Sequence, residues 1–157
     1  MTSLDDHRRR PALVAAIADT ACALQGVQVT LLSPTGAGKA AVATPRRVIG
    51  AMRGGAVKLT PARPDLVIAE GVETALSATS VFGRPAWAAL SASNLAAFTP
   101  PALVERLIIA ADRDDAGLDA GETLAARLAV RLEVSIRPPD DVEDWNAAAM
   151  AQAELAQ

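Results

Sequence analysis

Two short apolar runs constrain the fold of this sequence more than any other feature. Residues 66–69 read "LVIA" and residues 107–111 read "LIIAA", with no polar residue between. A strand with one solvated face alternates polar and apolar residues, whereas a strand covered on both faces is apolar throughout. Helical patterns follow both runs, at residues 72–82 and 116–131. We therefore predict an α/β fold, built on an open, mainly parallel sheet with helices on both faces.

Further strands and helices are expected along the rest of the sequence, and a linker marks where this domain begins. Two further strands are expected at residues 85–94 and 132–139, and a last helix from about Trp145. A proline-bounded linker at residues 61–64 precedes the first apolar strand. We place the α/β domain at residues 65–157 on this basis.

Residues 1–64 are predicted to form a small, basic α+β segment. A helix is expected at residues 11–25, because Pro11 suits the first helical position and Gly26 follows its end. Residues 27–34 alternate like a strand, and residues 40–45 resemble the returning strand of a β-hairpin. A short strand is expected around residues 57–60.

The charge of the chain is unevenly distributed. Residues 1–65 contain nine Lys and Arg against four acids, whereas residues 66–157 contain six against fourteen. The net charge of −3 therefore joins a +5 part to a −8 part. A protein that holds a polyanion beside a cation site would show this division, although two solvated surfaces of chance composition would show it too.

Several classes of chemistry are excluded by the residues that the chain lacks. Cys22 is the only cysteine and His7 the only histidine, so no cysteine-rich zinc site and no disulfide is expected. We interpret Cys22 as a buried apolar residue and His7 as solvated. No run approaches the roughly 18 apolar residues of a membrane span, and "MTSLDDHRRR" lacks a signal-peptide core. We expect a cytoplasmic protein with no membrane partner.

The stretch "SPTGAGKA" resembles a phosphate-binding P-loop, but we reject that interpretation. The motif needs a glycine where Ser33 stands and a hydroxyl where Ala40 stands. A hairpin turn fits better, and Lys39 can still contact a phosphate from that turn.

Carboxylates at the ends of two strands carry the main functional signal. Glu70 ends the first apolar strand, and Asp112 and Asp114 end the second. Sites in open parallel sheets form at the carboxyl ends of the strands. If the two strands are neighbours, these acids converge and repel one another unless a cation is bound. Oxygen ligands suit Mg²⁺ or Mn²⁺, and we favour such a site.

Each acid also has a purely structural interpretation. Asp114 or Asp115 can cap the helix that follows, and Asp144 can cap the last helix. Glu73 lies in a first helical turn, where acids interact favourably with the helix dipole. Because Glu70, Asp112 and Asp114 arrive from two different strands, we favour metal binding for these three.

Three segments together resemble the Toprim domain, the catalytic module shared by topoisomerases and bacterial-type primases. They are "VIAEGVETALSA", "LIIAADRDDAGLDAGETLAARL" and "PPDDVEDWNA". The family pattern is a strand ending in Glu-Gly, a strand ending in Asp-x-Asp with a glycine soon after, and a further acidic motif. It falls here on Glu70-Gly71, on Asp112, Asp114 and Gly117, and on Asp144 as a candidate further ligand. The likeness is greatest to primase-like or helicase-fused Toprim proteins of phages, plasmids and integrated mobile elements, and covers nearly the whole chain.

The resemblance implies primase-type nucleotidyl transfer in DNA replication, with single-stranded DNA and nucleoside triphosphates as partners. Glu70, Asp112 and Asp114 would hold Mg²⁺ (or Mn²⁺), with no zinc, and Glu70 would also act as general base. Gly71 would let a phosphate approach the backbone. Basic residues would line the template path: Lys39, Arg46, Arg47, Arg53 and Lys58.

Full primases of this type carry a zinc-binding module and more of a basic subdomain before the Toprim part. The resemblance therefore implies a catalytic fragment, or a protein that needs a helicase or zinc-module partner. Two alternatives stay open: a Toprim nuclease, which needs the same carboxylates, and a non-catalytic DNA-binding or assembly module of a mobile element.

Overall fold

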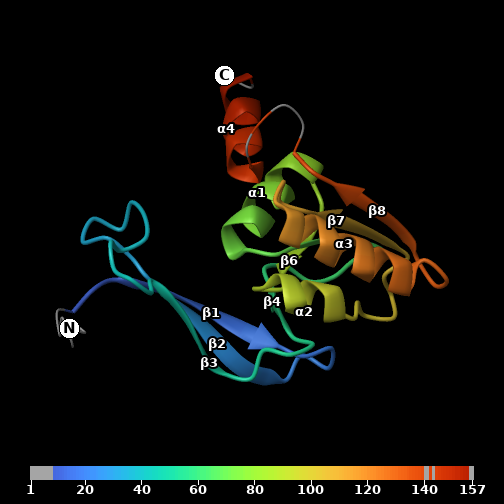
Figure 1. Cartoon of the computed structure of the whole chain (residues 1–157), viewed down its shortest axis with the longest axis horizontal. Helices are drawn as coiled ribbons and strands as arrows, with labels where there is room; N and C mark the ends of the chain where they lie inside the picture. Colours follow the sequence, from blue (N-terminus) through green and yellow to red (C-terminus); the bar gives the residue numbers. More distant parts are fainter. Residues whose placement is uncertain (1–8, 140–141, 143, 156–157) are drawn as a thin grey trace.

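One eight-stranded sheet runs through the computed structural model (Figure 1), which describes residues 9–139, 142 and 144–155. His7 lies outside these residues. The strand order is β3-β2-β1-β4-β6-β5-β7-β8. The elements are β1 (Ala12–Ala18), β2 (Leu24–Leu31), β3 (Arg46–Gly50), β4 (Ala56–Lys58), β5 (Asp65–Ala69), α1 (Val72–Phe82), β6 (Ala86–Ala88), α2 (Ala92–Ala97), β7 (Arg106–Ala110), α3 (Asp115–Leu128), β8 (Glu133–Arg137) and α4 (Trp145–Leu155).

Strands β6, β5, β7 and β8 are parallel neighbours, and helices cover both of their faces. Val67 and Ala69 of β5 pack with residues of α1 and with Trp145 of α4 on one face. Leu66 and Ile68 pack with residues of α2 and α3 on the other. Burial on both faces explains why β5 and β7 are apolar without alternation, and it confirms the predicted fold class.

Helix boundaries follow local signals closely where such signals exist. Helix α1 has the predicted bounds and ends at Gly83, whose φ of 61° is the left-handed conformation that glycine adopts readily. The predicted strand at residues 85–94 is only partly correct, because β6 ends at Ala88. Helix α2 begins soon after it, capped by Ser91, whose Oγ accepts a hydrogen bond from the Asn94 backbone N–H at 3.2 Å.

The helix predicted at residues 11–25 is wrong, because this segment begins with strand β1. Its residues pair antiparallel with β2 from Ala12 opposite Leu31 onward, and Ile17 and Ala18 also pair with β4. Pairing on two sides buries Ile17 completely and overrides the helix propensity of the alanines. Cys22 lies in the turn after β1 with a φ of 66° and is exposed, so its interpretation as a buried residue is also wrong.

The hairpin is present, but its returning strand is β3 rather than residues 40–45. Strand β3 pairs with β2 from Thr30 opposite Arg46 to Gly26 opposite Gly50. Residues 40–45 form a loop, tied to β2 by hydrogen bonds such as that from the Leu31 N–H to the Pro45 carbonyl (2.7 Å). Strand β4 lies where a strand was expected, and it joins the antiparallel strands to the parallel ones.

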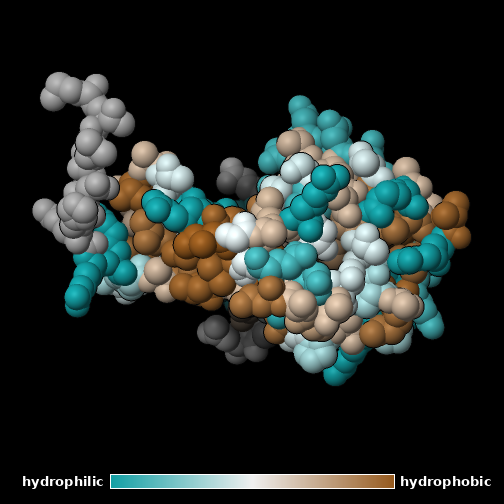
Figure 2. Space-filling model, turned by 90° about the horizontal axis from the view of Figure 1, so that it is seen from below, coloured by the Kyte–Doolittle hydropathy of each residue, from teal (hydrophilic) through white to brown (hydrophobic). Residues whose placement is uncertain are grey.

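Strands β1 to β3 extend to one side of the α/β part (Figure 1). Large apolar side chains on them are exposed, among them Val14 (60%), Leu24 (69%) and Ile49 (57%), and Figure 2 shows an apolar patch over this part of the molecule. Among the described residues, no helix has the length and apolar character that crossing a membrane requires.

Candidate metal centre

The acids that follow β5 and β7 lie at one edge of the sheet. The two strands are parallel neighbours in register, with Ala69 opposite Ala110. Glu70 directly follows Ala69, and Asp112 lies two residues after Ala110. Because the two strands are neighbours, as the sequence argument required, both acids lie at the same edge of the sheet. The Glu70 carbonyl accepts a hydrogen bond from the Leu90 N–H (2.7 Å), and the Ala111 N–H donates to the Arg137 carbonyl (3.2 Å). These bonds hold the backbone on both sides of the acids.

The acids at this edge interact electrostatically. Burial raises the pKa of Glu70 above its usual value, and the charges of Asp112 and Asp114 raise it further. Burial likewise raises the pKa of Asp112, with added repulsion from Asp114 and Asp144. Four carboxylates therefore act on one another, which favours either protonation or a bound cation.

Two neighbouring groups partly offset this repulsion. The positive charge of Arg46 lowers the pKa of Glu70, and hydrogen bonding from the Thr74 side chain lowers that of Asp112. Thr74 lies one helical turn after Glu70 and was not among the predicted site residues. Its position three residues after the Glu-Gly pair is the sequence signal that points to it.

Asp112 carries the observation that best fits a bound cation. Its Oδ1 atom is buried and has no hydrogen-bond partner among the described residues. However, within residues 9–139, 142 and 144–155 no three His, Cys, Asp or Glu side chains form a ready metal cluster. Mg²⁺ keeps several waters and needs only one or two protein carboxylates, so the side chains at this edge fit such an ion.

Asp114 caps helix α3. Its Oδ1 accepts a hydrogen bond from the Gly117 N–H at 2.7 Å, so the capping interpretation of this residue is correct. A Cβ atom at Gly117 would lie 3.1 Å from that Oδ1 and 3.3 Å from the Asp112 carbonyl oxygen. The glycine therefore lets the helix start pack tightly under the Asp-x-Asp turn. A ligand role for Asp114 stays a prediction and would fall to its other carboxylate oxygen.

Asp144 caps helix α4 in the same way. Its Oδ1 accepts a hydrogen bond from the Ala147 N–H at 2.8 Å, as the capping alternative predicted. The next residue, Trp145, is buried and donates a hydrogen bond from its Nε1 to the Ala111 carbonyl at 3.2 Å. Helix α4 thus begins beside Asp112, which explains why Asp144 affects the pKa of that carboxyl.

Gly71 caps helix α1 with an extended backbone. The nearest atom to a Cβ built there is Thr74 Oγ1, at 3.4 Å, so the fold leaves room at this position. The predicted close approach of a phosphate to this glycine stays a prediction.

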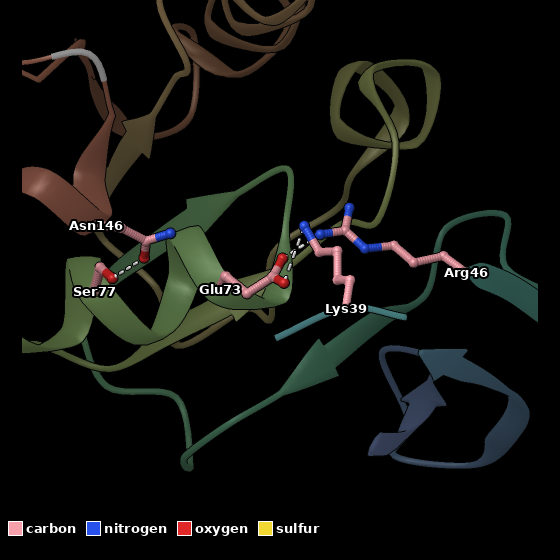
Figure 3. Close-up of polar contacts among 5 residues, drawn as sticks. All are labelled: Lys39, Arg46, Glu73, Ser77 and Asn146. Atoms are coloured by element: carbon pink, nitrogen blue, oxygen red, sulfur yellow. Dashed lines mark hydrogen bonds and ion pairs between the residues drawn. The ribbon is translucent and has the colours of Figure 1, made fainter. Parts of the chain in front are cut away.

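Two predicted basic residues reach the acid edge from the N-terminal strands. Figure 3 shows Lys39 and Arg46 both directed at Glu73 in the first turn of α1. Lys39 Nζ lies 3.1 Å from Glu73 Oε1, and Arg46 pairs with Glu73 Oε2. All three side chains are about 40% exposed (44%, 39% and 39%), so solvent and ligands can reach them. Glu73 therefore holds two cations beside Glu70.

The other predicted basic residues lie elsewhere. Arg47 follows Arg46 on β3, so its side chain points to the opposite face of that strand. Arg53 is exposed in the turn between β3 and β4. Lys58 stabilises the fold: its Nζ donates to the Asp19 carbonyl at 2.5 Å and lies 4.7 Å from the centre of the Trp87 ring. Of the five predicted cations, the contacts place Lys39 and Arg46 beside the acids.

Helix α4 is also held to α1 near the site. Figure 3 shows the Ser77 hydroxyl directed at the Asn146 side chain, and the two form a hydrogen bond of 2.5 Å. No sequence pattern used above links these two residues.

Three solved structures share this fold at low sequence identity. The primase fragment of the bacteriophage T7 primase-helicase protein is 18% identical, with a TM-score of 0.65 over 90% of this chain and 59% of that one. A DNA primase domain from Pseudomonas aeruginosa is 16% identical, with a TM-score of 0.62 over 95% and 50%. The DnaG primase catalytic domain bound to single-stranded DNA is 17% identical, with a TM-score of 0.64 over 95% and 50%. This chain thus spans 50–59% of the length of these structures.

Two family models match separate parts of the sequence. No curated protein matches it. Residues 2–59 match a domain of unknown function (DUF7146). Residues 65–154, more than half of the chain, match the Toprim domain, and β5, β7 and the acids that follow them lie within that match. The chain therefore belongs to the Toprim domain family, with a primase-like fold.

Proposed function

We propose that this protein is a metal-dependent, primase-type nucleotidyltransferase, or the catalytic part of one, that makes RNA primers on single-stranded DNA. The observation that carries the proposal is the acid edge of the parallel sheet, with two cations beside it. Glu70 and Asp112 have raised pKa values there, and Lys39 and Arg46 meet at Glu73. Anionic substrate groups would thus meet Lys39 and Arg46, and a divalent cation would meet the neighbouring carboxylates.

The residues divide into three roles. Asp112 and Asp114 would hold Mg²⁺ or Mn²⁺, with Asp144 as a possible further ligand. When bound, the ion would neutralise triphosphate charge and lower the pKa of an attacking 3′-hydroxyl. Glu70 would accept the proton of that hydroxyl at its carboxylate, and its raised pKa suits a general base. Lys39 and Arg46 would leave their ion pairs with Glu73 and bind substrate phosphates instead.

Additional protein would supply the rest of template capture. This chain spans only 50–59% of the similar solved structures, and two of them are primase parts described with a helicase or with single-stranded DNA. Arg47 and Arg53 offer exposed charges on the N-terminal strands, whereas the ammonium group of Lys58 is occupied within the fold. We propose a helicase or zinc-module partner, in the cytoplasmic replication of a mobile element.

The test is incubation with single-stranded DNA, ribonucleotides and Mn²⁺ or Mg²⁺, followed by sizing of the products. Ribonucleotide-dependent products longer than one nucleotide are expected. Glu70→Gln should lower product formation by about 10²–10⁴, the usual size of a general-base contribution, while Mn²⁺ and DNA affinity stay within a few-fold of the parent. Equal activity of Glu70→Gln and the parent would place the chemistry elsewhere. Shortened DNA without ribonucleotide incorporation would identify a nuclease instead.

One observation favours a non-catalytic module as the second candidate. Asp114 and Asp144 both use a carboxylate oxygen to cap a helix, and the described acids form no ready three-residue cluster. Weak metal binding would follow from such an arrangement. DNA binding without turnover, in the presence of either metal and a helicase partner, would support this candidate.

A further inference from the structure

Three arginines gather at the opposite edge of the parallel strands from the acids. Arg106 begins β7, Arg84 lies two residues before β6, and Arg63 lies two residues before β5. Together with Asp65, which begins β5, they line an open hollow of about 500 Å³. Strand β5 is five residues long, so this hollow lies roughly 16 Å along the sheet from Glu70. It is a separate site from the acid edge.

Asp65 positions two of these arginines. Its Oδ2 accepts a hydrogen bond from Arg84 Nε at 2.9 Å, and its Oδ1 accepts one from Arg106 Nε at 2.5 Å. Both contacts use Nε, so among the described residues the terminal nitrogens of both guanidinium groups stay available. Hydrogen bonds from Arg106 and Arg84 lower the pKa of Asp65, which keeps the carboxylate charged. The guanidinium groups are therefore held in place while their outer edges face the hollow.

The fold alone accounts for only part of this arrangement. Asp65 and Arg106 are opposite each other in the β5–β7 ladder, so their pair stabilises the strand register. Arg63 makes no ion pair with any described residue, yet it lines the same hollow. Pro64 and Pro85 also line it and restrict the backbone next to Arg63 and Arg84. Three arginines thus line the hollow beside Asp65, and the charges of Glu133 and Glu105 also act on Arg106.

The positive charge continues along the open edge of the sheet. A neighbouring groove of about 230 Å³ is lined by Arg84, Arg106, Ser135 and Arg137, with Asp65 and Glu133 as its acids. Arg84, Arg106 and Arg137 are half of the six basic residues in the acidic part of the chain. The Arg137 carbonyl accepts from the Ala111 N–H, next to Asp112. The groove therefore leads from the arginine hollow along β8 toward the acid edge.

We propose that Arg63, Arg84 and Arg106 form a second, phosphate-binding site at this edge. Guanidinium groups present paired N–H donors that match phosphate oxygens, and groups already fixed by a carboxylate lose little freedom on binding. The phosphate can come from a nucleic-acid backbone or from a free polyphosphate. The groove along β8 favours a backbone that passes between the arginine hollow and the acid edge. The site does not depend on catalysis at the acid edge.

Binding measurements in EDTA test the site independently of any metal-dependent activity. The probes are a fluorescent oligothymidylate, followed by anisotropy over a range of salt concentrations, and sodium tripolyphosphate, followed by calorimetry. The variants are Arg63→Ala, Arg84→Ala and their combination, which leaves Arg106 paired with Asp65. Arg131→Ala is the matched control, because it removes one exposed arginine from the turn after α3. Circular dichroism confirms that each variant is folded.

For a backbone phosphate, each arginine removed should flatten the log–log salt slope by about 0.7, and weaken oligothymidylate binding about eightfold at about 50 mM salt. The control should leave both values unchanged. Loss of tripolyphosphate binding alone would support the site and identify a free polyphosphate as its ligand. Unchanged binding of both probes in the double variant would overturn the proposal. A labelled poly-glutamate, followed by anisotropy in the same buffers, is the charge control. An equal loss of its binding would also overturn the proposal, since the site would then recognise an acidic peptide by charge alone.

Discussion

Replacing Asp112 by asparagine tests the acid edge most directly, because this residue combines burial, repulsion and an unpaired oxygen. The substitution keeps the size of the side chain and an acceptor for the Thr74 hydroxyl, but it removes the charge. Burial, with added repulsion from Asp114 and Asp144, raises the pKa of Asp112, so a charged side chain here opposes folding when no cation is bound. We therefore expect Asp112→Asn to be more stable than the parent protein in EDTA at neutral pH.

The size of the effect follows from removal of the charge, because asparagine leaves a polar atom in the place of Oδ1. A difference of one pKa unit corresponds to about 1.4 kcal/mol, and Asp112 is only partly buried, so about 1 kcal/mol is expected. For a chain of this length, that corresponds to a rise in Tm of about 2–4 °C. Mn²⁺ should reverse the order of the two proteins, because it stabilises the parent through Asp112. At a hundredfold excess over Kd, a ligand stabilises the protein by about 2.7 kcal/mol, or roughly 5–10 °C here.

Thermal unfolding followed by circular dichroism, in EDTA and in Mn²⁺, measures both effects on the same samples. The parent should be the less stable protein in EDTA and the more stable one in Mn²⁺. Asp119→Asn is the control, because Asp119 is an exposed acid on α3 and its loss changes the net charge equally. An equal Mn²⁺ response of Asp112→Asn and the parent would refute the assignment of the metal to Asp112. A lower Tm of the variant in EDTA would refute the repulsion argument.

Four further substitutions test three other features. Glu73→Gln releases Lys39 and Arg46 from their ion pairs. Exposed ion pairs contribute about 0–1 kcal/mol, so Tm should change little. Affinity for single-stranded DNA in EDTA should rise, and weaker binding would contradict this. Gly117→Ala places a Cβ 3.1 Å from a carboxylate oxygen and should lower the free energy of unfolding by about 1–3 kcal/mol. Gly71→Ala should change the free energy of unfolding by less than about 0.5 kcal/mol. Urea unfolding measures both variants, and equal losses would show that the close contact at Gly117 is unimportant. Because arginines lower the pKa of Asp65, its pair contributes stability above its unfolded pKa of 3.8, and this is lost as the pH falls through the lower folded value. Unfolding at several pH values should therefore show a constant stability difference between the parent and Asp65→Asn above about pH 5, and a shrinking one below about pH 4.

The parallel half of the sheet and the place of its acids could be predicted from the amino-acid sequence. Strands covered on both faces are recognisable from their apolar runs alone, as residues 66–69 and 107–111 illustrate. Helix α1 was predictable at both ends, because Gly83 supplies a local stop signal. Since parallel strands have their carboxyl ends at one edge, Glu70 and Asp112 were expected to converge once the strands were taken as neighbours.

Features that depend on contacts between distant residues could not be predicted in this way. The alanine-rich segment of β1 has a helical composition, and only its pairing with β2 and β4 makes it a strand. Likewise, residues 40–45 were predicted to pair with β2, and the ladder from Thr30–Arg46 to Gly26–Gly50 shows that β3 pairs with it instead. This choice brings Arg46 to Glu73 across 27 positions of sequence. Ion pairs and strand pairings of this kind join residues that are far apart in the sequence, and no local pattern links them. They contribute to the stability of the fold only after the sheet has assembled.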